Sequence, residues 1–384
     1  MIHIVHLLTC LGRGGAERAL ADIVAATDRD RFRHTVCYLQ PPHDLSEEFE
    51  RAGCKTVYLD VGGTRNWLSA AAKFAAELHH LQPDLIQSAT SDANIVARLA
   101  ARGTKRMHLT WLVSMEYDPA AIRAAGWSPL KMEVRRRMEA WTSRRAASRF
   151  VACSGAVKRS AMDRLGAPAD LIELIYNPVG QASIETGPRD AQALRARLSI
   201  MPEAFVYLMV GRMDAAKAHA TALEAFRQVA AGQPDAHFLM IGHGPMRGRL
   251  EIQALEAGLA SRVHLMESVE SVAPFFAAAN AFLFPSMLEG LPVAVLEAMT
   301  AGLPVIVSDI PPHVEVVEQD RTGIIVPRGA PGGMADAMQR LYANRSLAHA
   351  IGFAARQDAA KRFSTAAIVP QWETLYDRLV QEGT

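Results

Sequence analysis

Two cations in one short loop, Arg212 and Lys217, are the first side chains whose types and spacing suggest chemistry. They lie in the segment GRMDAAKAHATALEAF, where an apolar run typical of a strand gives way to a helical pattern. Two positive charges there can neutralise a departing diphosphate, which is the main electrostatic requirement of a reaction that expels one. Surface arginine and lysine residues are common, so each of them taken singly is more readily interpreted as a solvated side chain.

A second candidate region is the segment FLFPSMLEGLPVAVLEAMTAGLPVIVS. The pattern predicts a strand that ends at Pro285 and a helix with Pro292 in its first turn and Gly302 at its end. Ligands of open parallel sheets bind beyond the carboxyl ends of the strands, so Glu289 would lie where a phosphate or a sugar sits. Because Pro292 has no N–H, the candidate backbone donors are those of Gly290, Leu291 and Val293.

Glu297 follows within the same helix, where its neighbours are apolar. A buried carboxylate is costly unless it is hydrogen-bonded, and the hydroxyls of a ribose would supply the donors. The alternative is a glutamate on an exposed helix face.

Near the N-terminus, the segment LGRGGAERAL places Gly12, Gly14 and Gly15 between a predicted strand and a predicted helix. Such a turn can hold a phosphate against backbone N–H groups, although a simple tight turn explains the glycines equally well. A dinucleotide fingerprint would need glycine at Glu17 and an acidic residue after the second strand, so NAD binding is disfavoured.

The sequence offers weak candidates for a metal site. Asp28 and Asp30 form a D-x-D pattern before the second predicted strand, where an ion-pairing loop is the better interpretation because no other ligand cluster is visible. The four cysteines, at positions 10, 37, 54 and 153, form no C-x-x-C pair and fit buried thiols in a reducing compartment. We therefore expect no metal and no cofactor, and a cytoplasmic protein.

The charges of the chain are nearly balanced overall but are locally uneven. Lysine and arginine total 41 against 40 aspartate and glutamate residues, and this balance argues against a nucleic-acid partner. Residues 131–149 nevertheless contain seven positive and two negative charges. They form either a solvated helix face or a patch for anionic lipid headgroups or a phosphate-bearing acceptor. No apolar run is long enough to predict a membrane span, and the N-terminus lacks the pattern of a signal peptide.

The elements that position these residues alternate along the chain, and this alternation predicts an α/β fold with parallel sheets. The first domain is expected to have strands at residues 2–8, 34–39, 55–59, 84–88, 107–113 and 149–153. A break rich in Pro, Gly and polar residues predicts a linker at 176–203. The second domain would contain the strands FVYLMVG, HFLMIG, RVHLME, AFLFPS, LPVIVS and TGIIVP. A final helix follows Pro370.

Taken together, these segments resemble the retaining glycosyltransferases of family 4, also called group 1. The residues that carry the resemblance are GGAER, CSGAVKRSAMDRLGAPADLIELIYNPV, VGRMDAAK, IGHGPMRGRLE, RVHL, PSMLEGLPVAVLEAMTAGLPVIVSD and GIIVP. The resemblance implies a GT-B fold with two doubly wound Rossmann-like domains facing across a cleft. It implies an acceptor domain at 1–175, the linker at 176–203, a nucleotide-sugar domain at 204–360, and a helix at 361–384 that returns to the first domain.

The resemblance also implies roles for particular residues. Arg212 and Lys217 match the pair that binds the donor diphosphate, Glu297 the carboxylate that binds the ribose, and Glu289 the residue that faces the donor sugar. Further matched donor contacts are Gly14, Gly15, Gly211, Gly242, Gly290, Leu291 and the base-side segment Arg262, Val263, His264 and Leu265.

Two departures from the family pattern are visible. The family's Lys-Gly is Lys217-Ala218 here. The histidine that many members carry near the donor sugar is replaced by Ser114, Met115 and Glu116, and His108 comes too early on the strand. Glu116 is therefore our candidate substitute.

The expected activity is retaining transfer of a sugar from a UDP-, GDP- or ADP-sugar to a hydroxyl of a saccharide or a lipid-linked saccharide. Bacterial polysaccharide or glycolipid assembly, at the inner face of the plasma membrane, is the expected setting. A non-hydrolysing nucleotide-sugar epimerase and a non-catalytic nucleotide-sugar-binding protein remain as alternatives.

Overall fold

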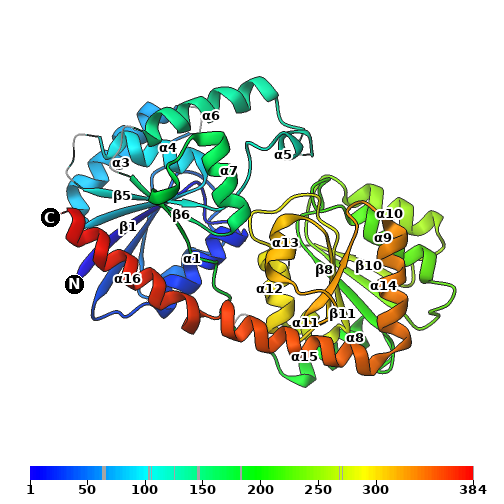
Figure 1. Ribbon diagram of the computed structural model, residues 1–384. Coiled ribbons are helices and arrows are strands. Elements are labelled where there is room, and N and C mark those ends of the chain that lie inside the picture. Colours follow the sequence, from blue (N-terminus) through cyan, green and yellow to red (C-terminus); the bar gives the residue numbers. More distant parts are fainter. Residues whose placement is uncertain are drawn as a thin grey trace. The chain divides into compact units, whose positions relative to one another are not determined.

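The computed structural model describes residues 1–62, 66–102, 104, 106–124, 126–144, 148–181, 184–267, 269 and 271–383. The chain divides into two compact units. Unit 1 comprises Met1–Pro178 and Thr365–Thr384, and unit 2 comprises Val179–Ser364. The chain therefore crosses between the units twice (Figure 1).

Unit 1 is built on a seven-stranded parallel sheet with the strand order β3-β2-β1-β4-β5-β6-β7. Its strands are β1 (Ile2–Leu8), β2 (Phe32–Tyr38), β3 (Lys55–Tyr58), β4 (Leu85–Ala89), β5 (Met107–Leu112), β6 (Ser148–Ala152) and β7 (Ile172–Leu174). Its helices are α1 (Gly15–Ala26), α2 (Ser46–Arg51), α3 (Trp67–Leu81), α4 (Ser91–Ala100), α5 (Pro119–Ala124), α6 (Pro129–Ser143), α7 (Gly155–Leu165) and α16 (Thr365–Gly383).

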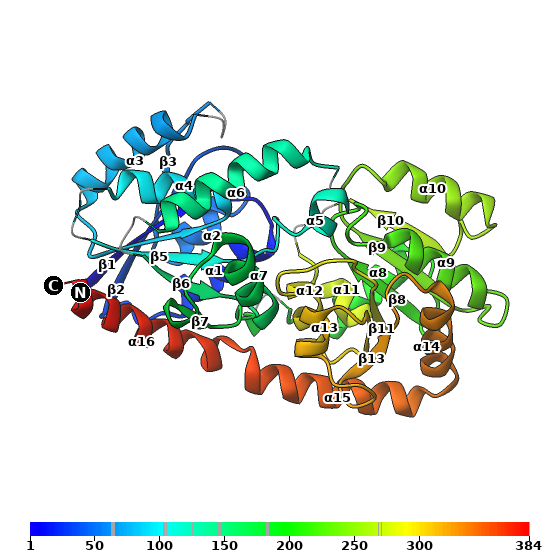
Figure 2. The same ribbon diagram turned by 45° about the horizontal axis from the view of Figure 1, so that its top comes forward.

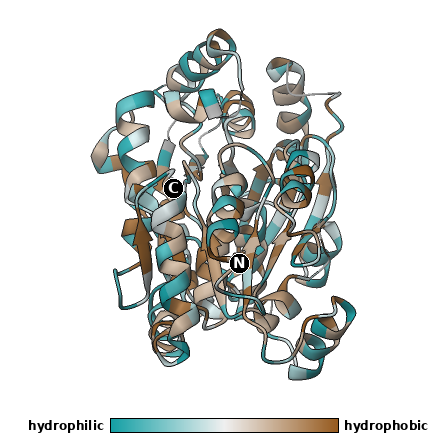
Figure 3. Cartoon of the chain, turned by 90° about the vertical axis from the view of Figure 1, so that its right-hand side faces the viewer, coloured by the Kyte–Doolittle hydropathy of each residue, from teal (hydrophilic) through white to brown (hydrophobic). Residues whose placement is uncertain are grey.

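Both faces of this sheet are covered, so β1 and β4 are buried along almost their whole length although they include His3, His6, Gln87 and Ser88. In β1, Ile4 and Leu8 face a core shared with α1 and α16, whereas Val5 and Leu7 face a core shared with α3 and α4. Figure 3, coloured by hydropathy, shows brown hydrophobic segments in many strands of the chain and both brown and teal segments on the helices. The predicted doubly wound arrangement is confirmed.

Unit 2 contains a six-stranded parallel sheet with the order β10-β9-β8-β11-β12-β13. Its strands are β8 (Val206–Val210), β9 (His237–Ile241), β10 (Val263–Met266), β11 (Ala281–Phe284), β12 (Val305–Ser308) and β13 (Gly323–Val326). Its helices are α8 (Pro188–Arg197), α9 (His219–Val229), α10 (Arg247–Glu256), α11 (Ala273–Ala278), α12 (Val293–Thr300), α13 (Pro311–Val316), α14 (Pro331–Ala343) and α15 (Arg345–Arg362).

The structure corrects the predicted linker at 176–203. Most of that segment belongs to unit 2, where α8 buries Leu194 and Arg195 donates to the carbonyl oxygens of Ala278 at 2.6 Å and Ala204 at 3.0 Å. The charged composition of α8 concealed this, because a single buried leucine gives almost no apolar periodicity. The strand β7 was also missed, since three residues carry too little pattern.

The last helix packs in unit 1, as the resemblance implied, and begins at Thr365 instead of 361. Trp372 is buried with its ring 5.2 Å from that of Trp111, and the Tyr376 hydroxyl donates to Gln87 at 2.7 Å. On the surface, Arg31 pairs with Asp377. Figure 1 shows this helix in red beside α1.

The Asp28–Asp30 segment forms a turn. The Asp28 carboxylate accepts the backbone N–H of Asp30 at 2.9 Å, and the backbone N–H of Asp28 donates to Glu373 on α16. The segment thus joins the end of α1 to the last helix.

We predict that the fold loses stability in mild acid because of buried histidines. Burial lowers the pKa of His34, His219 and His313 to about 4, against an unfolded value of 6.5. Between those values the unfolded chain binds more protons than the folded one, so the free energy of unfolding falls as the pH drops from 6.5 towards 4. Each histidine should contribute about 2 kcal/mol of loss between pH 7 and pH 5.

Urea unfolding at both pH values measures this. His313→Asn should reduce the pH dependence, whereas His79→Asn, at an exposed position on α3, should leave it unchanged. Equal pH dependence in wild type and His313→Asn would contradict the assignment.

Candidate functional site

Arg212 and Lys217 lie in the loop between β8 and α9, which Asp214 organises. The Asp214 carboxylate accepts the backbone N–H of Lys217 at 3.1 Å and the Nε–H of Arg212 at 2.6 Å. Arg212 keeps 59% of its side chain exposed, and Lys217 keeps 23%. The two cations therefore differ, because one is open to solvent and the other is largely enclosed.

Lys217 is bound to Glu289 across two loops. Its Nζ donates to Oε1 of Glu289 at 2.6 Å and lies 5.0 Å from the ring centroid of Phe284. Nearby, the backbone N–H of Met287 donates to the carbonyl of Ala216 at 2.7 Å. The loops follow β8 and β11, which are neighbours in the sheet, so the structure brings together the cations and Glu289 as the sequence predicted.

The segment that opens α12 differs from the prediction in two details. The helix begins at Val293, and Pro292 is its N-cap. The backbone N–H of Val293 donates to the carbonyl of Leu291 at 3.0 Å, so Val293 is not a free donor for a ligand. Gly290 and Leu291 remain at the position where the sequence placed them, directly after Glu289.

Glu297 is 7% exposed, with Val295, Leu296, Ala298 and Met299 buried around it in α12. The alternative of a solvated glutamate is therefore wrong. A carboxylate so enclosed must be hydrogen-bonded or paired.

His313, near the start of α13, was not among the residues predicted from the sequence. Its ring is buried and lies 5.7 Å from that of Phe284, and Nδ1 lies 2.9 Å from the carbonyl oxygen of Ser308. Burial lowers the pKa of His313 to about 4, with Lys217 adding to the effect and Glu289 opposing it. A neutral ring that donates from Nδ1 presents Nε2 as an acceptor. The sequence signal that could have identified His313 is its position shortly after the strand β12.

Several buried polar atoms near Lys217 have no hydrogen-bond partner within the described residues. They are Nε2 of His313, Oγ of Ser286 and both ring nitrogens of His219. Native proteins rarely leave such atoms unsatisfied, and those that remain call for water or a ligand. These atoms can therefore form hydrogen bonds to water or to a ligand at this edge of the sheet.

The glycines of the matched motifs have a packing role. A Cβ at Gly242 would lie 2.0 Å from the carbonyl oxygen of Gly211, so the turns after β8 and β9 can approach only because residue 242 has no side chain. Ala218, where the family has glycine, has φ of 53°, a left-handed conformation that favours glycine.

The base-side segment is only partly at this edge. Arg262 precedes β10 and donates to the carbonyls of Ala230 and Gln233, and His264 lies 3.1 Å from His237 at the start of β9. Arg262 and His264 therefore lie at the amino half of the strand, and the donor contact expected of them stays a prediction. Val263 is buried, and Leu265 lies near the carboxyl end, where its carbonyl accepts from Arg247.

In unit 1, Gly14 and Gly15 lie where α1 begins. Gly14 is the N-cap, and a Cβ there would be 2.2 Å from a carboxylate oxygen of Glu17. Glu17 is 9% exposed, and burial raises its pKa. Its carboxyl group thus covers the helix N-terminus at which a phosphate was expected.

Unit 1 also has a polar pocket where β4 and β5 end. It contains Ser114, Met115 and Glu116, the residues that replace the family's histidine. Lining it are Thr90, Ser91, Asn94, Trp111, Leu112, Val113, Ser114, Met115, Glu116, Tyr117, Glu139, Val157, Ser160, Ala161 and Leu165. His108 lies outside this lining, buried against Ser88 at 2.9 Å.

One wall of the pocket is a fully bonded carboxylate. Glu139 accepts the Tyr117 hydroxyl at 2.6 Å and the side-chain amide of Asn94 at 2.9 Å, and Arg98 lies 3.8 Å away. This group comes from α6, α4 and the loop after β5, so no local pattern revealed it.

Glu116 is less well compensated. It accepts the Ser91 hydroxyl at 3.0 Å, but Arg135, 3.7 Å away, lies closer to Asp92, at 2.5 Å. Burial, together with the negative charge of Glu139, raises the pKa of Glu116 to about 7. Glu116 can therefore gain or lose a proton near neutrality.

We predict that Lys217→Met lowers the free energy of unfolding by about 2 kcal/mol, because it leaves the enclosed Glu289 carboxylate without its cation. Arg212→Met should cost less than about 1 kcal/mol, because that ion pair is exposed. Urea unfolding measures both, and Lys217→Met/Glu289→Gln should recover part of the loss. Equal losses in the two single variants would show that the Lys217 pair does not hold the loops together.

We further predict that Glu116→Gln stabilises the protein at pH 8 and has little effect at pH 5. The folded pKa is raised above 4.5, so the folded state binds the extra proton and stability falls as the pH rises from 4.5 to 7. The gain should be about 2 kcal/mol, seen as a higher melting temperature at pH 8. Glu133→Gln, on the surface of α6, is the control, and a gain there of the same size would refute the explanation.

Comparison with known proteins identifies the family and the fold of this chain. The family model described as "Glycosyl transferases group 1" matches residues 190–358, and the one described as "Glycosyltransferase Family 4" matches residues 13–181. Among curated relatives, exopolysaccharide phosphotransferase SCO2592 of Streptomyces coelicolor is 26% identical over 70% of this chain. The 2-deoxystreptamine glucosyltransferase of Streptomyces kanamyceticus is 29% identical over 64% of it. The matches span 26% and 65% of those two proteins.

Solved structures support the same architecture. Anabaena Alr3699/HepE, crystallised with UDP-glucose, superposes with a TM-score of 0.84 at 23% identity, covering 98% of this chain and all of the other. Sucrose-phosphate synthase from Thermosynechococcus elongatus has a TM-score of 0.82 at 21% identity over the full length of both chains. The two doubly wound units are those of a GT-B fold. With matches to both family models, this chain belongs to the group 1, family 4 glycosyltransferases.

Proposed function

We propose that this protein transfers a glycosyl group, with retention of configuration, from a nucleotide-diphospho-sugar to an acceptor hydroxyl. The observation that carries the proposal is the meeting of Arg212, Lys217 and Glu289 where two neighbouring strands of unit 2 end. Lys217 is bonded to Glu289, and Arg212 is bonded to Asp214. The structures of Anabaena HepE with UDP and UDP-glucose support a donor of this class, and UDP-, GDP- and ADP-sugars are all candidates.

In the proposed reaction the bond between the anomeric carbon and the diphosphate oxygen breaks. The acceptor oxygen forms its bond to the same face of the sugar, and its proton passes to the departing phosphate. The negative charge that develops on the diphosphate is stabilised by Lys217, by the exposed Arg212 and by the backbone N–H groups of Gly290 and Leu291. Glu289 orients the sugar, and Glu297 binds the ribose hydroxyls.

His313 extends this arrangement. Its Nε2, which has no partner among the described residues and belongs to a ring kept neutral by burial, can accept a hydrogen bond from a donor hydroxyl without adding charge beside Lys217. His313 thus supplies a polar contact that the motif residues do not.

We propose that the acceptor binds in unit 1 at the pocket that contains Glu116. An acceptor hydroxyl would donate to the Glu116 carboxylate beside Ser91. A saccharide or a lipid-linked saccharide fits this chemistry, and polysaccharide or glycolipid assembly is the proposed setting. Within the described residues, no three His, Cys, Asp or Glu side chains are grouped as metal ligands. The proposal assigns charge neutralisation to the cations and backbone N–H groups instead of a metal ion.

The test is a transfer assay with a donor chosen by thermal-shift screening of UDP-, GDP- and ADP-sugars. Arg212→Ala should lower turnover about a hundredfold, because it removes stabilisation of the leaving charge while its exposed position leaves folding intact. Arg249→Ala, an exposed arginine on α10, is the matched control.

Three further measurements sharpen the result. Lys217→Ala should cause at least as large a loss per folded molecule, and transfer should persist in EDTA. Analysis of the donor without acceptor separates an epimerase, which changes the sugar, from a transferase. Full turnover in both cation variants, or donor binding with no transfer across an acceptor panel, would refute the proposal.

A further inference from the structure

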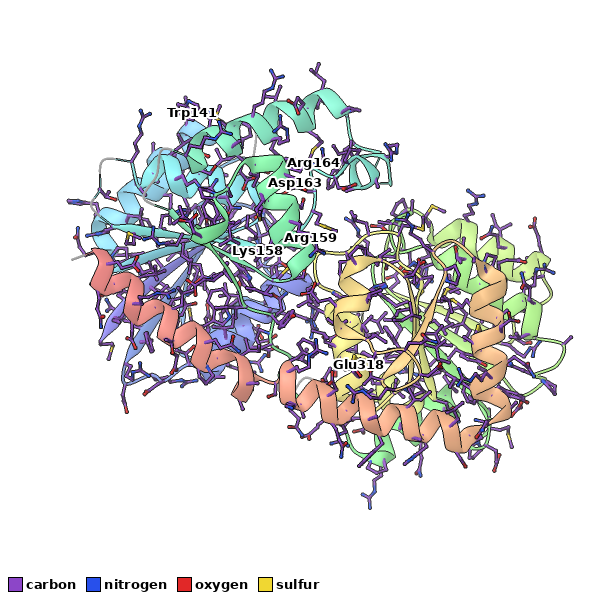
Figure 4. The ribbon with its side chains drawn as sticks, viewed as in Figure 1. Trp141, Lys158, Arg159, Asp163, Arg164 and Glu318 are labelled. Atoms are coloured by element: carbon purple, nitrogen blue, oxygen red, sulfur yellow. The ribbon has the colours of Figure 1, made fainter. Side chains whose placement is uncertain are left out.

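The outer face of α6 carries an unusual set of exposed side chains. Leu130, Val134, Arg137, Trp141 and Arg144 follow one another at three- and four-residue spacings, which places them on one side of the helix. The exposed fractions are 75% for Leu130, 54% for Val134 and 40% for Trp141. Figures 1 and 2 show α6 on the outer side of unit 1, and in Figure 4 Trp141 lies on this helix. We call these five residues the α6 face.

The opposite side of α6 is held firmly in unit 1. Met132 and Ala140 are buried, Glu139 bonds to Tyr117, and Arg135 pairs with Asp92 at 2.5 Å. The apolar side chains of the α6 face are therefore presented to solvent by a well-anchored helix. Surface helices ordinarily place polar residues there, and clustered exposed apolar residues mark interaction sites.

The charges beside these apolar groups are mainly positive. Lys131, Arg137 and Arg144 are exposed, and Arg102 from the end of α4 lies 5.8 Å from the ring of Trp141. Glu133 is the neighbouring carboxylate, and hydrogen bonds from Arg136 and Arg137 lower its pKa to about 2. The surface thus combines apolar and cationic groups, which is the composition that binds anionic membrane interfaces.

Several of the cations in the basic segment at 131–149 are already paired within the protein. Arg135 and Arg136 are engaged with Asp92 and with Glu133, and Arg149 pairs with Glu382 on α16. Residues 145–147 lie outside the described part of the chain. The exposed cations at α6 are then Lys131, Arg144 and Arg137, of which Arg137 shares the Glu133 carboxylate at 2.7 Å but keeps 76% of its side chain exposed.

We propose that the α6 face docks on an anionic lipid bilayer. Leu130, Val134 and Trp141 enter the headgroup region, while Arg102, Lys131, Arg137 and Arg144 pair with lipid phosphates. A bilayer is favoured over a protein partner because the apolar groups alternate with cations along a single helix. Among the described residues, no helix meets the length and hydropathy expected of a membrane span. The inference does not depend on the proposed transfer reaction.

Co-sedimentation of the full chain with lipid vesicles tests this. Binding should be measured to phosphatidylcholine alone and to phosphatidylcholine with 30% phosphatidylglycerol, each in low and high salt. We expect binding to the anionic vesicles in low salt, and its loss in high salt, because salt screens the attraction between the cations and the surface.

Two double variants separate the contribution of the cations on α6 from that of the apolar side chains of the α6 face. Lys131→Gln/Arg137→Gln should weaken binding roughly 25-fold, about fivefold per cation. Leu130→Glu/Val134→Glu should weaken it at least as much. The matched controls on unit 2 are Arg249→Gln/Lys361→Gln and Ile252→Glu/Leu255→Glu, which change exposed residues of the same kinds and should bind like wild type.

Absence of binding to the anionic vesicles in low salt overturns the proposal, as does equal weakening by the α6 variants and their controls. A wild-type dimer in light scattering that Leu130→Glu/Val134→Glu converts to a monomer also overturns it, because the α6 face would then join two copies of the chain. Retained vesicle binding by the transfer-deficient Arg212→Ala shows that the two proposals stand or fall separately.

Discussion

The ion pair between Lys217 and Glu289 is the contact on which the candidate site depends. It joins the loops after β8 and β11, two strands that are neighbours in the sheet but far apart in the chain. In this structure the Glu289 carboxylate is bonded to the Lys217 ammonium group, which is the group proposed to bind a diphosphate. In the proposed function, binding of a donor diphosphate would share or exchange that contact, and Arg212, whose exposed side chain pairs with Asp214, is the cation that could move first.

Most of the fold could be predicted because both sheets are parallel and covered on both faces. Strands such as β8 and β12 are then buried and mainly apolar, and the glycine and proline residues in the segments that follow them indicate where they end. Prediction failed where this constraint is weak. The strand β7 has three residues at the edge of its sheet, and α8 attaches through one leucine and an arginine that bonds to carbonyl oxygens.

The site was predictable to the extent that it lies in local motifs. Arg212, Lys217, Glu289 and Glu297 follow from the loop and helix that carry them. The pairing of Glu139 with Tyr117 arises from elements brought together only by folding. Similarly, the N–H of Val293 donates within a turn, and Arg262, at the amino end of β10, donates to backbone carbonyls. The residue types alone do not predict either of these hydrogen bonds.

Because α16 belongs to unit 1, unit 2 is an insertion within the fold of unit 1. The first 178 residues leave the ribosome with Trp111 and Gln87 lacking the aromatic partners that complete their surroundings, and these partners arrive only after the whole second unit has been made. Because the chain is synthesised from its N-terminus, unit 1 begins first but would be completed only after unit 2 has been synthesised. Until α16 has been synthesised, the part of unit 1 that packs against the buried Trp372 and Tyr376 lacks its covering helix.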